Sequence, residues 1–179
     1  MIKSIVVLTF SIMIISFCTG KISPYSDNSD KPFIKDGKID IDKNGIYDVK
    51  LTKDSIKISN FYEELFKLVP LNDTQTLQSR RILGVEIYHV GDVILSKAKP
   101  PIYWADSTLI LAWKILPDST RWRGNWAGQR GYLPLKIKIG SEYHCSWIEM
   151  KIDTVEEKFK VFEVYHNPIP DQDLVIKDP

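Results

Sequence analysis

The pattern that most restricts the fold of this chain is a series of short runs in which apolar and polar residues alternate. Apolar residues occupy every second position in residues 47–51, 133–139 and 143–147. Because successive side chains of a strand point to opposite faces of a sheet, this period of two predicts strands with one buried face. Gly140 and Ser141, between the last two runs, predict a two-residue hairpin turn.

Two further runs, residues 109–116 and 159–165, are apolar at nearly every position. Such runs are typical of strands that are central in a sheet or covered on both faces. Many short strands separated by turn residues favour an all-β fold. We predict a two-sheet antiparallel β-sandwich, jelly-roll-like, that occupies residues 34–179.

One segment, residues 60–69, also fits a short helix. Asn60 and Glu63 have the spacing of a capping box, and the apolar residues that follow recur at helical intervals. A loop or an irregular strand that crosses the rim of the sandwich is the alternative, and the sequence does not choose between this and the helix.

The charges of the chain nearly balance. It has 24 Lys+Arg and 23 Asp+Glu among 179 residues, with a formal net charge of +1 at pH 7. A balanced chain has no basic field to attract phosphates, so we do not expect it to bind nucleic acid. Its two cysteines, Cys18 and Cys145, provide neither a disulfide framework nor a CxxC pair for zinc.

The first residues predict export from the cytoplasm. Lys3 precedes an apolar run, residues 5–17, that is shorter than the ~20 residues needed to span a bilayer. We interpret residues 1–17 as a signal peptide, Cys18 as the acceptor of a lipid anchor, and residues 18–33 as a flexible polar tether. The expected location is therefore the cell envelope, with the bilayer as a partner.

Phe17 departs from the small residue that usually precedes a lipidated cysteine. Cleavage before Lys21, with secretion of a chain that carries no lipid, is therefore the alternative.

The strongest chemical pattern is the acidic segment at residues 40–48. Asp, Asp, Asn and Gly at its first, third, fifth and sixth positions match the beginning of a calcium-binding loop. Leu51 stands where an EF-hand needs a bidentate acid, so the segment is not an EF-hand.

The acidic segment also predicts a hairpin. A loop made of Lys43-Asn44-Gly45 would place Ile39 opposite Val49 and Asp40 opposite Asp48. Like charges that face each other repel, and a bound cation would relieve the repulsion. Ca²⁺ suits such an oxygen-rich site. The expected ligands are Asp40, Asp42, Asn44 and Asp48. The alternative is a solvated hairpin whose acidic residues keep an edge strand soluble.

Two tryptophans, Trp122 and Trp126, lie in a polar, glycine-containing loop beside Arg, Asn and Gln residues. Exposed rings in such a setting could stack on sugars or contact a protein partner, so a carbohydrate-binding module is the alternative function. Buried rings would instead cap one end of the sandwich and would exclude a sugar site at these positions.

The remaining candidates for catalysis do not form a predicted site. His144 and Cys145 are neighbours in an alternating run, so their side chains point to opposite faces and cannot form a nucleophile–base pair. Glu149 with Asp153 or Glu163 could supply two carboxylates for glycoside cleavage, but no pattern selects them. We therefore expect a non-catalytic module, structural or binding, whose specific role the sequence does not define.

Five short stretches follow one another in a fixed order within residues 40–176. They are residues 40–48, Gly91-Asp92-Val93-Ile94, Tyr132-Leu133, His144-Cys145-Ser146-Trp147 and Tyr165-His166-Asn167-Pro168. In this order they resemble a family of uncharacterised exported bacterial β-sandwich proteins. Pro134, Cys145 and Ser146 replace the glycine, tyrosine and glycine that are usual in that family. The resemblance implies a sandwich fold and export, and it implies no activity.

Overall fold

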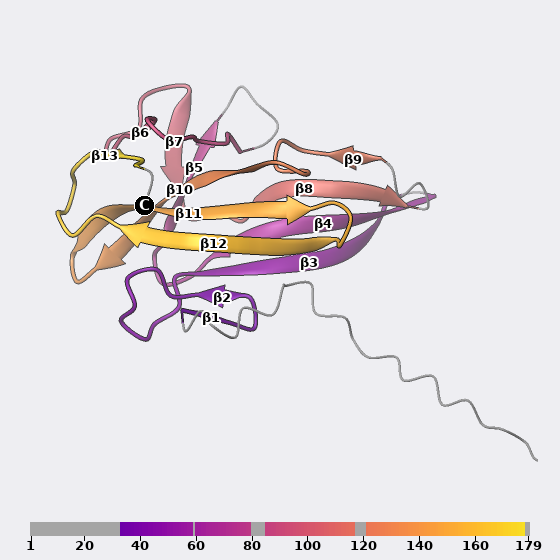
Figure 1. Ribbon diagram of the computed structural model, residues 1–179, viewed down its shortest axis with the longest axis horizontal. Coiled ribbons are helices and arrows are strands. Elements are labelled where there is room, and N and C mark those ends of the chain that lie inside the picture. Colours follow the sequence, from indigo (N-terminus) through magenta and orange to yellow (C-terminus); the bar gives the residue numbers. More distant parts are fainter. Residues whose placement is uncertain (1–32, 59, 80–84, 117–120, 178–179) are drawn as a thin grey trace, which may run out of the picture.

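The computed structural model describes residues 33–58, 60–79, 85–116 and 121–177. These residues form thirteen strands and no helix (Figure 1). In chain order the strands are β1 (Ile34–Lys35), β2 (Lys38–Ile39), β3 (Val49–Ile58), β4 (Phe61–Pro70), β5 (Gln75–Ser79), β6 (Val93–Ile94), β7 (Ile102–Ala105), β8 (Leu109–Leu116), β9 (Trp122–Arg123), β10 (Arg130–Ile139), β11 (Glu142–Asp153), β12 (Lys158–His166) and β13 (Leu174–Val175).

The long strands form two antiparallel sheets that pack face to face. One sheet has the strand order β1-β2-β3-β4-β8-β9, and the other has the order β12-β11-β10-β5-β7. The chain crosses from the first sheet to the second between β4 and β5, and again between β9 and β10. The predicted all-β sandwich is therefore confirmed.

The core between the sheets follows from the alternation seen in the sequence. Leu133, Leu135 and Ile137 of β10 are fully buried between the sheets. The opposite sheet contributes buried apolar residues of β3, β4 and β8 to the same cluster. The hairpin turn predicted between β10 and β11 is confirmed, because Ile139 pairs with Glu142 across it.

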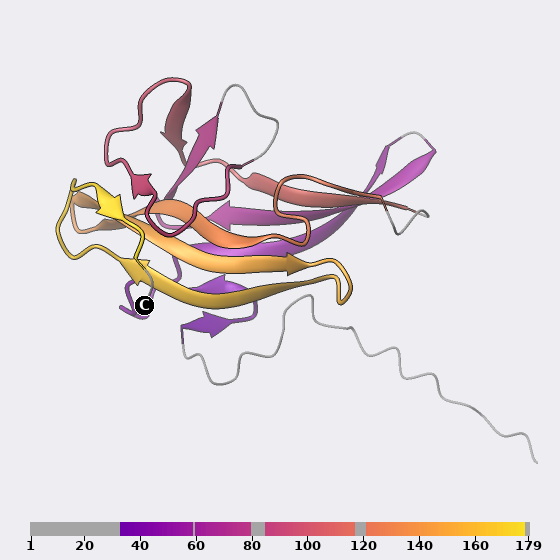
Figure 2. The same cartoon turned by 45° about the horizontal axis from the view of Figure 1, so that its top comes forward.

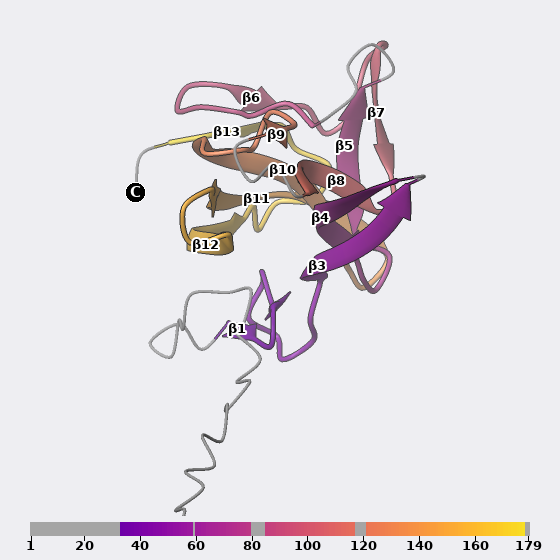
Figure 3. The ribbon, with the colours of Figure 1, turned by 90° about the vertical axis from the view of Figure 1, so that its right-hand side faces the viewer.

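A small third layer covers part of the outer face of the five-stranded sheet (Figure 3). In this layer β6 pairs with β13, which brings residues near 94 next to the C-terminal segment. Ile94, Leu174 and Ile176 pack on Cys145 and Trp147 of β11. Strand β11 is therefore buried on both faces, although its sequence alternates.

Residues 60–69 do not form the helix that their capping-box spacing allowed. Strand β4 pairs with β3 along its whole length and with β8 on its other side. These two neighbours satisfy its backbone groups, and this non-local pairing outweighs a weak local helix preference. Leu65 and Leu68 have the spacing of a helix, but in the strand Leu68 faces the core while Leu65 is buried on the opposite face.

Residues 159–165, which are apolar at nearly every position, lie in β12. This strand is at an edge of its sheet and not at the centre. Val161 and Val164 face the core, and the pairing with β11 shifts register between them. The guanidinium of Arg130 lies 4.0 Å from the ring centroid of Phe162. On the face of β12 that points away from the core, the Arg130 side chain and not another sheet covers the strand. Apolar residues therefore occur on both faces of this run.

Strands β3 and β4 extend past the other strands of their sheet, at the right of Figure 2 and away from β13. Their ends carry exposed apolar side chains: Ile56, Ile58, Phe61 and Tyr62. The predicted signal peptide (residues 1–17), Cys18 and most of the predicted tether (residues 18–33) lie outside the described residues. Within the described part of the chain, no helix is long and apolar enough to cross a membrane.

Candidate functional site

The loop between β2 and β3 brings three carboxylates together. Ile39 pairs with Val49, which is the predicted register, but the strand pairing ends there. The connection therefore spans residues 40–48 and is longer than the predicted loop Lys43-Asn44-Gly45. Gly45 has a φ of 90°, a left-handed conformation that glycine adopts without steric cost, and this allows the chain to reverse. One carboxylate oxygen from each of three residues lies within 4.8 Å of the others: Asp40, Asp42 and Asp48. We call this segment, residues 40–48, the acidic loop.

Main-chain hydrogen bonds orient two of these carboxylates. Asp40 accepts from the backbone N–H of Asn44 at 3.2 Å and of Gly45 at 2.8 Å. Asp48 accepts from the backbone N–H of Ile41 at 2.7 Å. The carboxylates are therefore held in place by the loop itself, before any ligand binds.

Hydrogen bonds of the Asn44 side chain stabilise the acidic loop. Its side-chain oxygen accepts from the backbone N–H of Ile46 at 2.7 Å, and its amide nitrogen donates to Asp42 at 2.7 Å. The predicted fourth ligand is thus engaged in an Asx turn, which is a common way to stabilise such a corner. The convergent group consists of the three aspartates.

Burial sets the electrostatics of the acidic loop. Asp40 and Asp48 are only 7% and 5% exposed, so the alternative of a solvated hairpin does not describe them. Burial, together with the charges of Asp42 and Asp40, raises the pKa of Asp48 to about 6. Burial also raises the pKa of Asp42. At neutral pH the loop therefore concentrates negative charge where water screens it poorly.

His166, at the end of β12, acts electrostatically on the acidic loop. Burial lowers the pKa of His166, and the negative charge of Asp42 opposes this effect. No sequence pattern connects His166 with Asp42, because they lie far apart in the chain and only the folded structure brings them within electrostatic reach.

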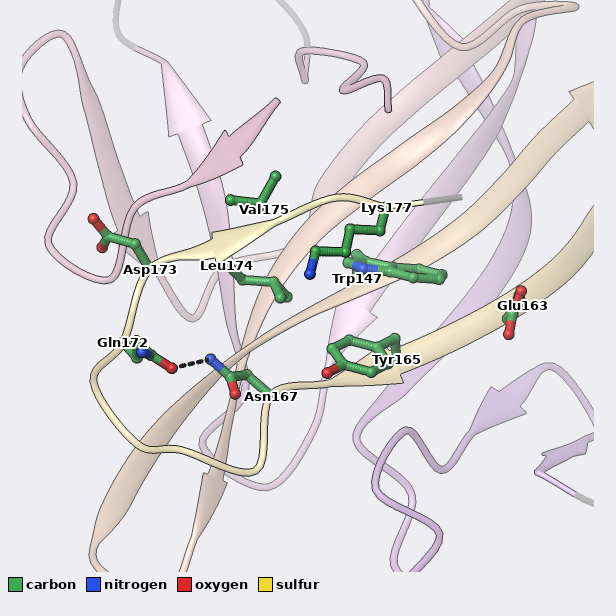
Figure 4. A pocket seen from close by; sticks show the side chains of 9 residues that line it. All are labelled: Trp147, Glu163, Tyr165, Asn167, Gln172, Asp173, Leu174, Val175 and Lys177. Atoms are coloured by element: carbon green, nitrogen blue, oxygen red, sulfur yellow. Dashed lines mark hydrogen bonds between the residues drawn. The ribbon is translucent and has the colours of Figure 1, made fainter. Parts of the chain in front are cut away.

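A pocket of about 410 Å³ lies on the outer face of the five-stranded sheet, between β12 and the C-terminal segment (Figure 4). Its lining includes Trp147, Tyr165, Asn167, Gln172, Leu174 and Lys177. We call it the aromatic pocket. Its size falls within the range of roughly 300–1,000 Å³ that is usual for small-molecule sites.

Three aromatic rings stand in a row beside the aromatic pocket. Trp147 of β11 is directly opposite Tyr165 of β12, and their rings stack with centroids 5.6 Å apart and planes 22° apart. Tyr132 of β10 meets Trp147 edge-on, with centroids 5.0 Å apart. Trp147 is only 4% exposed, whereas Tyr165 is 43% exposed. The sequence did not reveal this row, because it depends on the register of three strands.

Polar groups complete the lining. Asn167 is buried, and its amide nitrogen donates to the side-chain oxygen of Gln172 at 3.2 Å. Among the described residues there is no hydrogen-bond partner for the Gln172 amide nitrogen, the Tyr165 hydroxyl or the Lys177 ammonium. They remain available to a ligand.

The second predicted site, the pair Trp122 and Trp126, is not an exposed aromatic surface. Trp126 is 0% exposed and belongs to the core between the sheets. Trp122 is half-buried, with its ring centroid 5.2 Å from that of Phe66. A sugar cannot reach the Trp126 ring, so the expectation of a sugar site at these positions is wrong, and the alternative of a buried cap describes Trp126.

The predicted separation of His144 and Cys145 is confirmed. His144 is buried and donates its Nδ1–H to the backbone carbonyl of Asn167 at 2.8 Å. Cys145 packs on the other face, beneath the third layer. Burial raises the pKa of its thiol to about 11, so the thiolate that a nucleophile requires is not formed at neutral pH.

Two of the three carboxylates considered for glycoside cleavage form ion pairs. Glu149 accepts a hydrogen bond from Arg130 at 2.7 Å, in an ion pair. Asp153 accepts from Lys160 at 2.9 Å, and this bond lowers the pKa of Asp153. Glu163 is the cross-strand neighbour of Glu149. A general acid would need a raised pKa, which the ion pair denies to Asp153.

In comparisons with known proteins, no family model, no curated protein and no solved structure matches this chain. The functional conclusion therefore depends on the geometry of the acidic loop and of the aromatic pocket.

Proposed function

We propose that this protein is an exported, lipid-anchored, non-catalytic β-sandwich module of the cell envelope, structural or binding, with a structural Ca²⁺ in its acidic loop. The observation that carries the proposal is the convergence of the Asp40, Asp42 and Asp48 carboxylates within 4.8 Å. Export and lipid anchoring rest on the sequence of residues 1–18. The absence of catalysis rests on the structural contacts that His144, Cys145 and Asp153 make.

The chemistry of the acidic loop favours calcium over other ions. Its convergent atoms are carboxylate oxygens, the ligands that hard cations prefer. Calcium accepts an irregular shell of oxygen ligands at ~2.3–2.6 Å, whereas magnesium demands near-ideal octahedral geometry. The bound ion would offset both the burial and the repulsion that raise the pKa of Asp48. Calcium would thus link the beginning and the end of the β2–β3 connection, which carry Asp40 and Asp48.

Calcium is expected to bind and stabilise the full-length chain. An extracytoplasmic site with a Kd of ~0.1 mM would add about 2.7 kcal/mol to the free energy of unfolding at ~10 mM calcium. Titration calorimetry should detect the binding, and thermal melting should show a higher Tm. Asp42→Asn should weaken both effects. Asp106→Asn, at an exposed acid outside the loop, is the matched control and should change neither. No heat and an unchanged Tm at millimolar calcium would rule out the ion.

Cys18 is expected to carry the lipid. In cells fed a fatty-acid probe, the wild-type chain should become labelled and Cys18→Ala should not. Cys145→Ala is the matched control, because that thiol is buried, and it should leave labelling intact. Labelling that persists in Cys18→Ala would show that this cysteine is not the acceptor.

Carbohydrate binding is the second candidate function. The exposed ring of Tyr165, backed by Trp147 beside a pocket with polar walls, supports it.

A further inference from the structure

We infer that the aromatic pocket is a binding site for a neutral saccharide, with a sugar ring lying against Tyr165. This inference deepens the binding role proposed above and rests on it. It does not depend on calcium in the acidic loop.

Tyr165 has the properties of a preformed sugar-stacking surface. Trp147 covers one face of its ring, and Tyr132 in turn fixes Trp147, so the Tyr165 ring is held in one orientation. Enough of the ring stays exposed, 43% of the residue, to receive a ligand. The C–H groups on one face of a pyranose form an apolar patch that packs on such a ring. A preoriented ring also loses little conformational freedom when the ligand binds.

The polar lining suits hydroxyl groups. Leu174 points into the pocket toward the aromatic pair, and Lys177 extends beside Trp147 (Figure 4). The Gln172 amide nitrogen and the Lys177 ammonium can donate, and the Tyr165 hydroxyl can donate or accept. A sugar hydroxyl also does both, so a polyhydroxylated ligand can satisfy these groups. A purely apolar ligand would leave them without partners, which costs affinity.

The charges in the lining favour a neutral ligand. Glu163 and Lys177 supply one charge of each sign. The third charged residue, Asp173, accepts the backbone N–H of Ser96 at 2.7 Å, and its carboxylate points away from the aromatic pair (Figure 4). A phosphate or sulfate group would meet a single cation with an acid in the same pocket. An uncharged sugar is not repelled by Glu163 and does not need Lys177 as a counter-charge.

The test is an array of neutral, phosphorylated and sulfated oligosaccharides probed with the full-length chain, followed by calorimetry with the best neutral ligand. Tyr165→Ala should lower the affinity at least tenfold, and Gln172→Ala should lower it several-fold. Tyr165→Phe keeps the ring and should bind within a few-fold of wild type. Tyr62→Ala is the matched control, because Tyr62 is a 51% exposed strand tyrosine at the opposite end of the sandwich. It should bind as wild type does.

Three outcomes would overturn the inference. They are no binding of any neutral sugar at millimolar concentration, equal affinity in wild type and Tyr165→Ala, and a preference for phosphorylated or sulfated glycans.

Melting curves of each variant establish that it is folded, and Gln172→Ala tests the site without touching the aromatic row. Cleavage of the bound glycan would instead contradict the non-catalytic role. If sugar binding persists in EDTA and calorimetry detects no calcium binding, the proposed calcium site is contradicted and the saccharide site is not.

Discussion

Trp126→Ala is expected to lower the free energy of unfolding by about 3–5 kcal/mol, the usual cost of truncating a large buried aromatic residue. The Trp126 side chain is fully buried in the core. Its loop is fixed on both sides: the backbone N–H of Gly128 donates to the Ile152 carbonyl at 3.0 Å, and the Asn125 amide donates to the Val85 carbonyl at 3.4 Å. Because these contacts prevent the loop from collapsing, a cavity should remain.

The measurement is urea unfolding of the full-length chain, followed by circular dichroism. Tyr62→Ala provides the comparison, because its exposed side chain should cost less than about 1 kcal/mol. Sugar binding should be unchanged in Trp126→Ala at temperatures where it remains folded. A loss below about 1 kcal/mol in Trp126→Ala would show that this ring does not belong to the core.

Asp48→Asn is expected to stabilise the calcium-free protein at pH 7. Burial and the neighbouring aspartates raise the pKa of Asp48 from 3.8 to about 6. Between these two pH values the folded protein keeps a proton that the unfolded chain has released, so the stability contributed by this group falls as pH rises. Above pH 6 the full effect is about 3 kcal/mol. Asparagine does not ionise, so Asp48→Asn should recover about 2–3 kcal/mol.

Calcium is expected to reverse the direction in which the stability of the wild-type chain changes with pH. The ion requires the ionised carboxylates, so its stabilising effect should appear as pH rises through 6. With calcium at pH 7 the wild-type chain should gain stability and Asp48→Asn should not. Urea unfolding at pH 4, 5, 6 and 7, in EDTA and in millimolar calcium, measures both effects, with Asp106→Asn as the control. The assignment of Asp48 fails if Asp48→Asn and wild type respond alike to pH and to calcium.

Much of the acidic loop could be predicted from its residues because the interactions that form it are local. Asn44 and Gly45 favour a corner, and the alternation on either side sets the register between Ile39 and Val49. The burial of Asp40 and Asp48 was not predictable in the same way. It depends on how the loop packs in the folded chain, where His166 at the end of β12 is close enough to Asp42 to interact with it electrostatically.

Two alternatives that the sequence left open are excluded for a common reason. A helix at residues 60–69 remained possible because local capping and spacing rules ignore the two strands that pair with β4. The Trp126 ring looked available because polar neighbours surround it in the sequence, yet it enters the core. In both cases a long-range contact outweighed the local pattern.

By itself the sequence determined that this chain forms strands, which of their faces are apolar, and where its tight turns lie. These features depend on residues that are close together along the chain, and on the period of two that a pleated strand imposes. Tertiary structure alone decided which side chains from distant strands meet. The row of Tyr132, Trp147 and Tyr165 exists because β10, β11 and β12 pair in one register and the C-terminal segment leaves one ring uncovered. The energies that select such a register are summed over whole sheets, so no short stretch of residues contains them.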